Sequence, residues 1–291
     1  MSENREPSLF DGTEYEPVKK VVNVASVPNR SPFRYPGGKT WLVPTIRKWL
    51  HNAKEATLIE SFCGGGTVGL TAAAENLAER VTMIEMDEDV ACVWKVILND
   101  AEWLAQEILT FSLTPENIKR VTSNPISEKE KAFATIIRNR TNHGGILAPG
   151  SGTIKKGEGG KGLASRWYPA TLARRIRDID SYKSRLTFIE GDAFDYFKEE
   201  MYNENTYYFI DPPYTVAGKR LYSHSDINHE LLFEKTANLK CHYLMTYDLC
   251  DYVISLAEKY GMQYRTIPMQ TTHLVTKEEL LISNDFSWLT D

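Results

Sequence analysis

The tetrapeptide Asp211, Pro212, Pro213 and Tyr214 combines residue types that could hold a planar amino group. The apolar residues 207–210 before it predict a buried parallel strand, which the prolines must end because proline lacks the N–H of a sheet ladder. The Asp211 carboxylate could accept one N–H of an amino group and the Pro212 carbonyl the other, while Tyr214 could stack on the ring that carries it. A strand-ending turn with a packed tyrosine would show the same residues, so the tetrapeptide needs support from the rest of the chain.

Two glycine-rich segments earlier in the chain have the composition of ligand-binding turns. Residues 33–40 place paired glycines and a lysine before an expected helix at 41–51, and helix N–H groups beside a lysine can hold an anion. Residues 61–67 follow an expected strand at 57–60 and open a helix of small residues, which is the first βα unit of a Rossmann-like fold. The spacing of a Walker loop is absent from the first segment. Each segment could also be a plain turn at the start of a helix.

Acidic residues stand where two further strands are expected to end. Glu85 follows the expected strand 81–84, roughly 20 residues beyond the glycine loop, which is the place of the acid that binds ribose hydroxyls. Asp87, two residues later, is suited to cap the next helix. Asp192 follows the expected strand 186–189 and could accept the amino group of a cofactor adenine, or simply close a turn. Because open α/β sheets bind ligands at the carboxyl ends of their strands, these acids and the tetrapeptide are expected at one edge.

The elements needed to position these residues alternate between strand and helix. This pattern predicts an α/β fold, with a Rossmann-like sheet and helices on both of its faces. Hydrophobic periodicity places further helices at 90–109, 128–139, 171–183, 228–238 and 249–260, and further strands at 21–24, 242–246, 264–268 and 279–283. The last two strands are expected to form an antiparallel pair. Residues 215–225 are expected to form a polar loop that could close over a substrate.

Charge is distributed unevenly along the chain. The 291 residues carry a net charge of −5, yet residues 119–185 hold fifteen Lys and Arg against five Asp and Glu, which gives 15 − 5 = +10 and leaves −5 − 10 = −15 elsewhere. A basic segment in an acidic protein is what a phosphate backbone requires, although solvated helix faces would give the same count. The candidates for nucleic-acid contact, to bases or to phosphates, are Arg138, Asn139, Arg140, Lys155, Lys156 and Arg166.

Bulk composition fits a globular protein. Apolar residues make up 42% of the chain and charged residues 25%, and 291 residues can bury the core of one large domain with an insertion, or of two domains. No stretch is apolar and long enough to span a bilayer, and the polar start lacks a signal core, so we expect a cytoplasmic protein without membrane association. The four cysteines, Cys63, Cys92, Cys241 and Cys250, show no metal-ligand spacing, so we expect reduced thiols and no metal.

Three motifs in one order carry a family resemblance. They are residues 35–39 (Tyr-Pro-Gly-Gly-Lys), 62–66 (Phe-Cys-Gly-Gly-Gly) and 211–214 (Asp-Pro-Pro-Tyr). With them the chain resembles, over residues 31–291, the Dam-type DNA adenine methyltransferases, the alpha-class D12 family that uses S-adenosylmethionine. Ser61 stands where the family often has proline, and Tyr35 stands where some members have tryptophan. Family members carry a target-recognition insertion where the basic segment falls in this chain.

The resemblance implies roles for individual residues. S-adenosylmethionine would be bound by Tyr35, Lys39, Phe62, Gly64, Gly66, Glu85, Asp192 and Asp211. Methyl transfer would depend on Asp211, Pro212, Pro213 and Tyr214. The implied division is a tail at 1–30, a catalytic methyltransferase domain at 31–110 and 186–291, and a smaller, mainly helical DNA target-recognition insertion at 111–185. The implied reaction is site-specific transfer of the sulfonium methyl group to the exocyclic N6 of an adenine flipped out of double-stranded DNA.

Other interpretations stay open. The exocyclic N4 of cytosine has nearly the same geometry as adenine N6, and an RNA or protein amino-methyltransferase is a more distant alternative. A dehydrogenase would explain the glycine loop but not residues 211–214, and a catalytically silent DNA-binding relative would not need those residues. Methylation of cytosine C5 would need a Pro-Cys nucleophile, and the chain has no such dipeptide. We expect a monomer, with a cognate restriction endonuclease of a restriction–modification system as a candidate partner.

Overall fold

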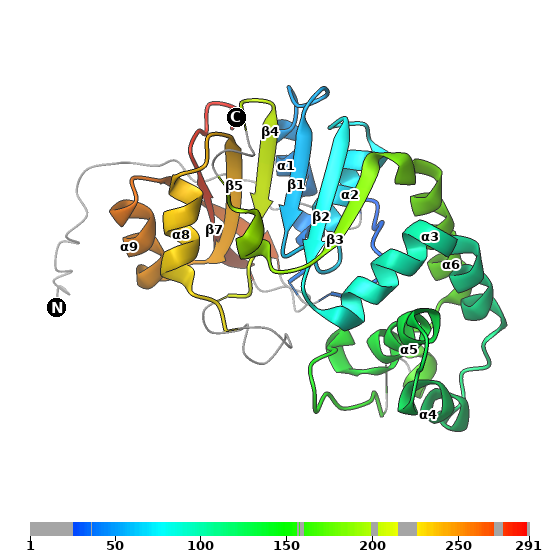
Figure 1. The fold of residues 1–291 in the computed structure, drawn as a ribbon. Coiled ribbons are helices and arrows are strands. Elements are labelled where there is room, and N and C mark those ends of the chain that lie inside the picture. The colour runs from blue at the N-terminus through cyan, green and yellow to red at the C-terminus, as the bar shows by residue number, and fades with distance from the viewer. Residues whose placement is uncertain are drawn as a thin grey trace, which may run out of the picture.

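A sheet of seven strands organises the computed structural model, which describes residues 26–35, 37–155, 157, 160–198, 203–214, 226–270 and 276–289. The strand order is β3-β2-β1-β4-β5-β7-β6. Strands β1 to β5 run parallel, and β7 runs antiparallel between β5 and β6 (Figure 1). The order reverses between β1 and β4, and this is the point at which open α/β sheets bind their ligands.

The strands agree with those expected from hydrophobic periodicity. Their bounds are β1 Thr57–Ser61, β2 Arg80–Glu85, β3 Leu186–Glu190, β4 Thr206–Ile210, β5 His242–Asp248, β6 Gln263–Gln270 and β7 Thr276–Ser283. The antiparallel pairing of the last two strands is confirmed. Strand β4 is buried along its whole length, as a central strand covered on both faces should be.

Helices connect the strands and form the insertion. Their bounds are α1 Val43–Trp49, α2 Thr67–Ala74, α3 Glu88–Thr110, α4 Pro115–Ser123, α5 Glu128–Thr141, α6 Pro169–Tyr182, α8 His229–Ala237 and α9 Asp251–Lys259. Shorter 3-10 helices include η2 at Lys39–Leu42 and η7 at Ala193–Tyr196. Helix α4 was not expected from the sequence. It buries none of its residues fully; Thr114 caps its first turn, and its short apolar side, Ile118 and Val121, packs partly buried against the core.

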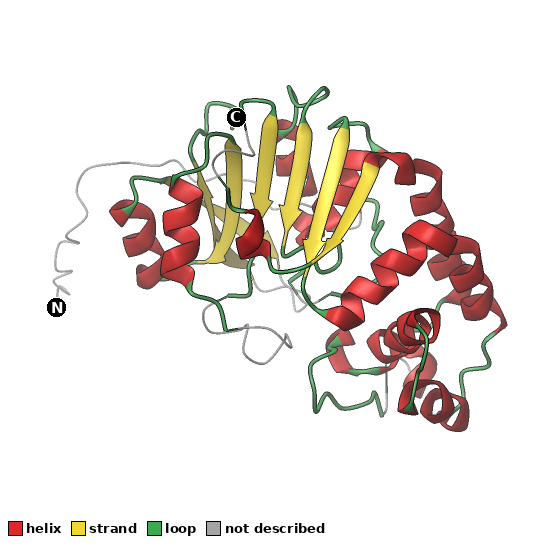
Figure 2. Cartoon of the chain, in the orientation of Figure 1, coloured by secondary structure: helices red, strands yellow, loops and turns green. Residues whose placement is uncertain are grey.

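Alternate side chains of the strands face two layers of helices (Figure 2). Leu58, Met83 and Phe209 lie in a core shared with α1, α2, α3, α5 and α6. Their strand neighbours Ile59 and Tyr208 lie in a second core shared with α8 and α9. This period of two is what parallel strands covered on both faces require, and it confirms the expected Rossmann-like α/β fold.

The expected insertion, residues 111–185, packs on the long helix α3. Phe111 meets Phe133 of α5 at a ring-centroid distance of 5.2 Å and Trp167 at 6.0 Å, both edge to face. Helices α4 and α5 lie beyond the carboxyl ends of the strands, on the β3 side of the sheet (Figure 1). The insertion therefore shares one continuous core with the sheet domain and overhangs the edge at which ligands are expected.

Several expectations fall outside the described residues. They concern the strand at 21–24, the substrate-covering loop at 215–225, and Lys156.

Candidate active site

The glycine loop after β1 turns sharply. Phe62 adopts φ +55°, and Gly64 and Gly66 adopt +46° and +63°, a left-handed conformation that glycine accepts without strain. The Trp94 indole N–H donates to the Gly64 carbonyl at 2.9 Å. A Cβ on Gly64 would overlap the ring of Tyr35, which lies against the loop. The loop is thus a fixed backbone surface that requires glycine where Tyr35 packs.

Glu85, at the end of β2, holds the backbone of this loop. Its carboxylate accepts the N–H of Gly64 at 2.8 Å and those of Met86 and Asp87 at 2.9 Å each. Burial raises the pKa of Glu85, and the N–H groups of Asp87 and Gly64 oppose that rise. The Asp87 side chain accepts the N–H groups of residues 89 and 90 and so caps α3, as its position predicts.

Glu60 is a second buried carboxylate, on β1 directly before the loop. It accepts the N–H of Val68 at 3.2 Å and of Gly69 at 2.7 Å, in the first turn of α2. Burial raises its pKa to about 8, despite the opposing backbone N–H groups. The charge of Asp211 raises the same pKa and that of Lys39 lowers it, so the three groups are close enough to influence one another.

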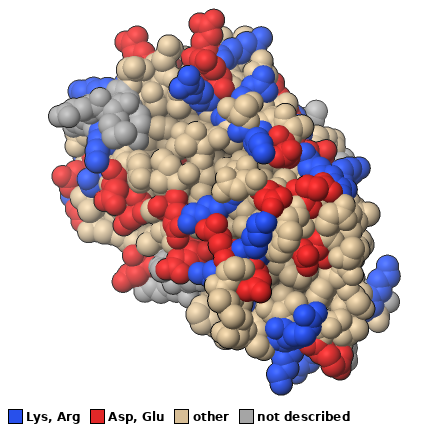
Figure 3. Space-filling view, turned by 45° about the vertical axis from the view of Figure 1, so that its right-hand side comes forward, with Lys and Arg blue, Asp and Glu red and all other residues tan. Residues whose placement is uncertain are grey.

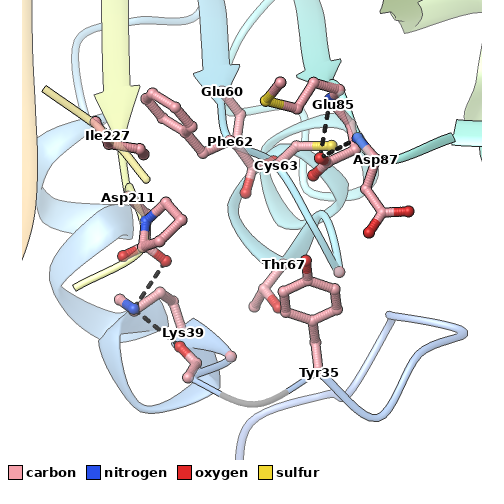
Figure 4. Close-up of a pocket in the computed structure, with 15 residues that line it drawn as sticks. Tyr35, Lys39, Glu60, Phe62, Cys63, Thr67, Glu85, Asp87, Asp211 and Ile227 are labelled. Carbon is pink, nitrogen blue, oxygen red and sulfur yellow. Dashed lines mark hydrogen bonds and ion pairs between the residues drawn. The ribbon is translucent and has the colours of Figure 1, made fainter. Parts of the chain in front are cut away.

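A pocket of about 670 Å³, including its open mouth, lies beside the loop (Figure 4). The lining comes from the turn before η2, the ends of β1, β2 and β4, and the segment before α8. The lining residues are Tyr35, Gly37, Gly38, Lys39, Glu60, Phe62, Cys63, Gly65, Thr67, Glu85, Met86, Asp87, Asp211, Pro213 and Ile227.

Asp211, directly after β4, is held through both carboxylate oxygens. The Thr246 hydroxyl on β5 donates to Oδ1 at 2.7 Å, and the Lys39 ammonium lies 2.8 Å from Oδ2 (Figure 4). Lys39 is 4% exposed and Asp211 21% exposed, so water weakens this ion pair less than it would at the surface. Pro212 is buried, and Pro213 lines the pocket.

Tyr214 turns away from the pocket lining and toward β7. Its hydroxyl lies 2.8 Å from Oε2 of the buried Glu279, to which it donates. Its ring lies nearly parallel to that of Tyr247, with centroids 6.0 Å apart and an interplanar angle of 21°. Lys39 Nζ lies 5.1 Å from the ring centroid of Tyr214. The ring is therefore held among three side chains in this conformation.

Most of the residues expected to bind a cofactor meet in the pocket. Tyr35, Lys39, Phe62, Glu85 and Asp211 line it, while Gly64 and Gly66 shape the adjoining loop. Asp192 does not line it. Its side chain is exposed and accepts the N–H of Phe194 at 2.9 Å, which caps η7 and matches the turn alternative.

The lining also contains residues that sequence reasoning did not assign to a ligand. They are Glu60, Cys63, Thr67, Met86, Asp87 and Ile227. Glu60 carries a usable signal, because it is an acid at the end of a strand just before the glycine loop. Ile227 carries none, since only the folded chain brings its segment to the edge of the sheet.

The residues expected to contact DNA lie in different environments. Asn139 is fully buried; its side chain bonds both backbone groups of Arg34, at 2.8 and 3.0 Å, and the Gly145 carbonyl at 2.7 Å. Arg140 is 7% exposed and donates to the Pro32 carbonyl. Both side chains are bonded inside the protein in this conformation, and a contact of either with DNA stays a prediction.

Three other candidates remain near the surface. Arg138 pairs with Asp89 at 3.2 Å, Lys155 is exposed, and Arg166 is half-buried. Their contacts with DNA stay predictions.

Ion pairs within the folded protein neutralise part of the positive charge of residues 119–185. Lys129, Lys131, Arg138 and Arg177 each pair with an acid of α3, namely Asp100, Glu88, Asp89 and Glu102. On the face shown in Figure 3, Lys and Arg side chains alternate with Asp and Glu and form no unbroken basic surface. The count of +10 therefore overstates the charge available to a phosphate backbone.

Within the described ranges, no cluster of three or more His, Cys, Asp or Glu could hold a metal ion. In the same ranges, no helix has the length and apolar character needed to cross a membrane. The four cysteines are free thiols, and Cys63, Cys92 and Cys241 are buried.

Comparison with known proteins identifies the family. The model of the family described as D12 class N6 adenine-specific DNA methyltransferase matches residues 35–264. None of the curated proteins matches the chain. A precorrin-6y C5,15-methyltransferase from Geobacter metallireducens has 10% identity and a TM-score of 0.38, with 93% of each chain covered. A SAM-dependent methyltransferase from Agrobacterium tumefaciens has 11% identity and a TM-score of 0.41, with 85% of this chain and 62% of that chain covered. Since the family model matches well over half of the chain, this protein belongs to the D12 class of N6 adenine-specific DNA methyltransferases.

Proposed function

We propose that the pocket binds S-adenosylmethionine and that Asp211 holds the amino group of the target adenine against it. Family membership gives the reaction, methylation of adenine N6 in DNA. One observation carries the assignment of roles to residues. The Asp211 carboxylate is fixed by Lys39 and Thr246 at a pocket that the glycine loop and Glu85 build.

The lining of the pocket suits a cationic ligand that carries a ribose. It contains four acidic side chains, those of Glu60, Glu85, Asp87 and Asp211, against the single ammonium of Lys39, and of these Glu60, with its pKa of about 8, is mostly neutral near pH 7. Glu85 lies at the end of β2, the usual place of a ribose-binding acid. Tyr35 and Phe62 add aromatic surface. When bound, S-adenosylmethionine supplies a methyl group on a positively charged sulfur, and the proposed mechanism uses no metal ion.

On the substrate side, Asp211 and Pro212 would orient the adenine amine. The Asp211 carboxylate accepts one N–H and the Pro212 carbonyl the other, which favours a pyramidal nitrogen with its lone pair directed at the methyl carbon. The nitrogen forms its bond to the methyl carbon as the carbon–sulfur bond breaks, and the nitrogen then releases a proton through Asp211 to solvent. Lys39 holds the Asp211 carboxylate in place before the amine arrives.

Stacking of the flipped base on Tyr214 requires a rearrangement. Lys39 Nζ lies over the Tyr214 ring, and Tyr247 lies parallel to that ring. A base that stacks on Tyr214 therefore requires the Lys39 ammonium to move off the ring while it stays paired with Asp211. Stacking contributes about 1–3 kcal/mol per base, which helps to offset the cost of extruding it from the duplex.

Replacement of Asp211 tests the proposed function directly. Asp211→Ala should abolish the transfer of a tritiated methyl group to DNA while cofactor binding, followed by calorimetry, largely survives. Asp251→Ala, at an exposed acid in the first turn of α9, is the matched control and should keep full activity. Full activity of Asp211→Ala would refute the role given to this carboxylate.

The identity of the methylated base needs its own measurement. Digestion of methylated DNA to nucleosides, followed by mass spectrometry, should give N6-methyladenine. Detection of N4-methylcytosine instead would favour the cytosine alternative, whose amine fits the same pair of acceptors.

We further propose that residues 111–185 recognise the DNA site and that the enzyme acts as a cytoplasmic monomer, with a cognate restriction endonuclease as a candidate partner. Light scattering on the purified protein tests whether it is a monomer. Methylation-sensitive sequencing of DNA from cells that express the enzyme would reveal the recognised site, and a chimera that exchanges residues 111–185 should change it.

A further inference from the structure

Residues 31–34 connect the insertion to the glycine loop. The Arg175 guanidinium on α6 donates to the Ser31 carbonyl at 3.2 Å, and that of Arg140 on α5 donates to the Pro32 carbonyl. On the other side, the Ser31 hydroxyl donates to the Gly65 carbonyl at 2.6 Å. The segment therefore lies between the arginines of two insertion helices and the loop of the cofactor pocket.

The segment brings arginines together without acidic partners. Among the described residues, no carboxylate lies within ion-pair distance of Arg34, Arg140 or Arg175. Arg34 Nη1 and Arg140 Nε are buried and have no hydrogen-bond acceptor. By contrast, Arg177, two residues from Arg175 on the same helix, is bonded to Glu102 through two nitrogens.

Mutual repulsion among these arginines shows how close they lie. Burial, together with the charges of Arg175, Arg34 and Arg166, lowers the pKa of Arg140 to about 9. Burial and the charge of Arg166 likewise lower the pKa of Arg34. We call Arg34, Arg140 and Arg175 the arginine cluster.

An arrangement of this kind destabilises the empty protein. Buried N–H donors without acceptors lower the stability of the fold, and repulsion between like charges lowers it further. An anion with several acceptor oxygens removes both penalties, and guanidinium groups match the geometry of phosphate oxygens. The cluster thus has the charge, the donors and the geometry of a phosphate site.

We propose that the arginine cluster binds a backbone phosphate of the DNA substrate, a site that rests on the proposed function. Arg34 and Arg175 are half-buried and can meet the phosphate, while the buried Arg140 adds its positive charge to the site. Tyr35 lines the cofactor pocket but Arg34 does not, so the cluster lies outside that pocket. It lies at the junction of the insertion and the sheet domain. A DNA duplex that contacts both parts would lie across this junction.

Binding of a DNA duplex to the full-length protein, followed by fluorescence anisotropy at several salt concentrations, tests this site. Arg34→Gln and Arg175→Gln should each weaken binding about tenfold and lower the slope of log K against log salt by about 1, as expected for one lost phosphate contact. Arg177→Gln is the matched control, because its charge is already paired, and should change neither quantity. Arg34→Lys should restore most of the slope.

A second measurement separates a phosphate site from a structural role. The Arg34 side chain makes no hydrogen bond through Nη1, so Arg34→Gln should leave the melting temperature of the free protein unchanged or raise it. Inorganic phosphate should raise the melting temperature of the wild type more than that of Arg34→Gln. If Arg175→Gln fails to fold, Arg34→Gln decides alone.

Wild-type affinity and salt slope in both Gln variants would overturn the proposal. So would an Arg34→Gln variant that binds DNA normally but loses cofactor affinity. A failure to methylate adenine would overturn the proposed function. Because binding of the duplex does not require methylation, the anisotropy measurement would still test the phosphate site.

Discussion

Lys39 and Asp211 form an ion pair, with Nζ and Oδ2 2.8 Å apart, that joins the first glycine-rich segment to the loop after β4. The same ammonium donates to the Gly37 carbonyl at 2.8 Å and lies over the Tyr214 ring. The resemblance implied a cofactor contact for Lys39. The structure adds a second relationship, because the lysine is the charged partner of the carboxylate proposed to hold the substrate amine.

Replacement of Lys39 by Met should mainly lower kcat. Without the ammonium, Asp211 loses its charged partner and its fixed orientation, although the Thr246 hydroxyl remains. The expected fall is on the order of 100-fold, the scale of losing one preorganised charged group. Lys54→Met, at an exposed lysine, should keep the wild-type kcat in the same assay. An unchanged kcat in Lys39→Met would remove Lys39 from the mechanism.

The ring and the hydroxyl of Tyr214 should have separable effects. Tyr214→Phe removes the hydrogen bond to Glu279 and should lower stability by about 1–3 kcal/mol, because a buried acceptor loses its donor. It keeps the ring, so methyl transfer should stay within about tenfold of wild type. Tyr214→Ala also removes the stacking surface and should raise the KM for DNA by about 10- to 100-fold. Equal KM values for the two variants would argue against base stacking on this ring.

Gly64→Ala should weaken cofactor binding through Tyr35. A Cβ at this position would overlap the Tyr35 ring, which must then leave the glycine loop. Gly261→Ala is a matched control, since Gly261 also has a positive φ, of +65°, but has open space around it. Both variants should lose about 1–2 kcal/mol of stability from backbone strain. Only Gly64→Ala should raise the Kd for S-adenosylmethionine, as measured by calorimetry.

Glu60 should make stability depend on pH with an unusual sign. Its pKa is about 8 in the folded protein and about 4.5 when unfolded, so the folded state binds more protons between these values. Its contribution to the free energy of unfolding is therefore complete below about pH 4.5 and is lost as the pH rises through about 8.

Denaturant unfolding of Glu60→Gln at pH 5, 7 and 9 tests this contribution. Glu85 and Glu279 are also buried acids with raised pKa values, so a residual slope of the same sign will remain in the variant. Glu55→Gln, at an exposed acid, should reproduce the wild-type slope. A Glu60→Gln slope equal to that of the wild type would show that Glu60 is ionised in the folded state throughout this range.

Local signals explain which parts of the site could be predicted. Glu85 and Asp211 follow apolar runs at strand ends, and parallel strands bring such ends to one edge whatever the rest of the chain does. Tyr35 and Lys39 flank a glycine turn before a helix, which is also a local pattern. These positions needed no knowledge of distant contacts.

The other features of the site could not be predicted, because they depend on contacts between segments that are far apart in the sequence. A count of charges along residues 119–185 could not show that the acids of α3 pair with much of that charge. Nor could it show that Asn139 and Arg140 are buried against residues 32–34. The partner of Asp211 was missed for the same reason, because Lys39 reaches it only through the assembled sheet.

The place of β7 in the sheet determines when during synthesis the catalytic loop can mature. Strand β7 enters between β5 and β6 although it follows both in the sequence. Glu279, the partner of the Tyr214 hydroxyl, lies on β7. A nascent chain must therefore have β7, the last of the described strands in the sequence, outside the ribosome before Tyr214 acquires this anchor, so this part of the catalytic loop is fixed late in folding.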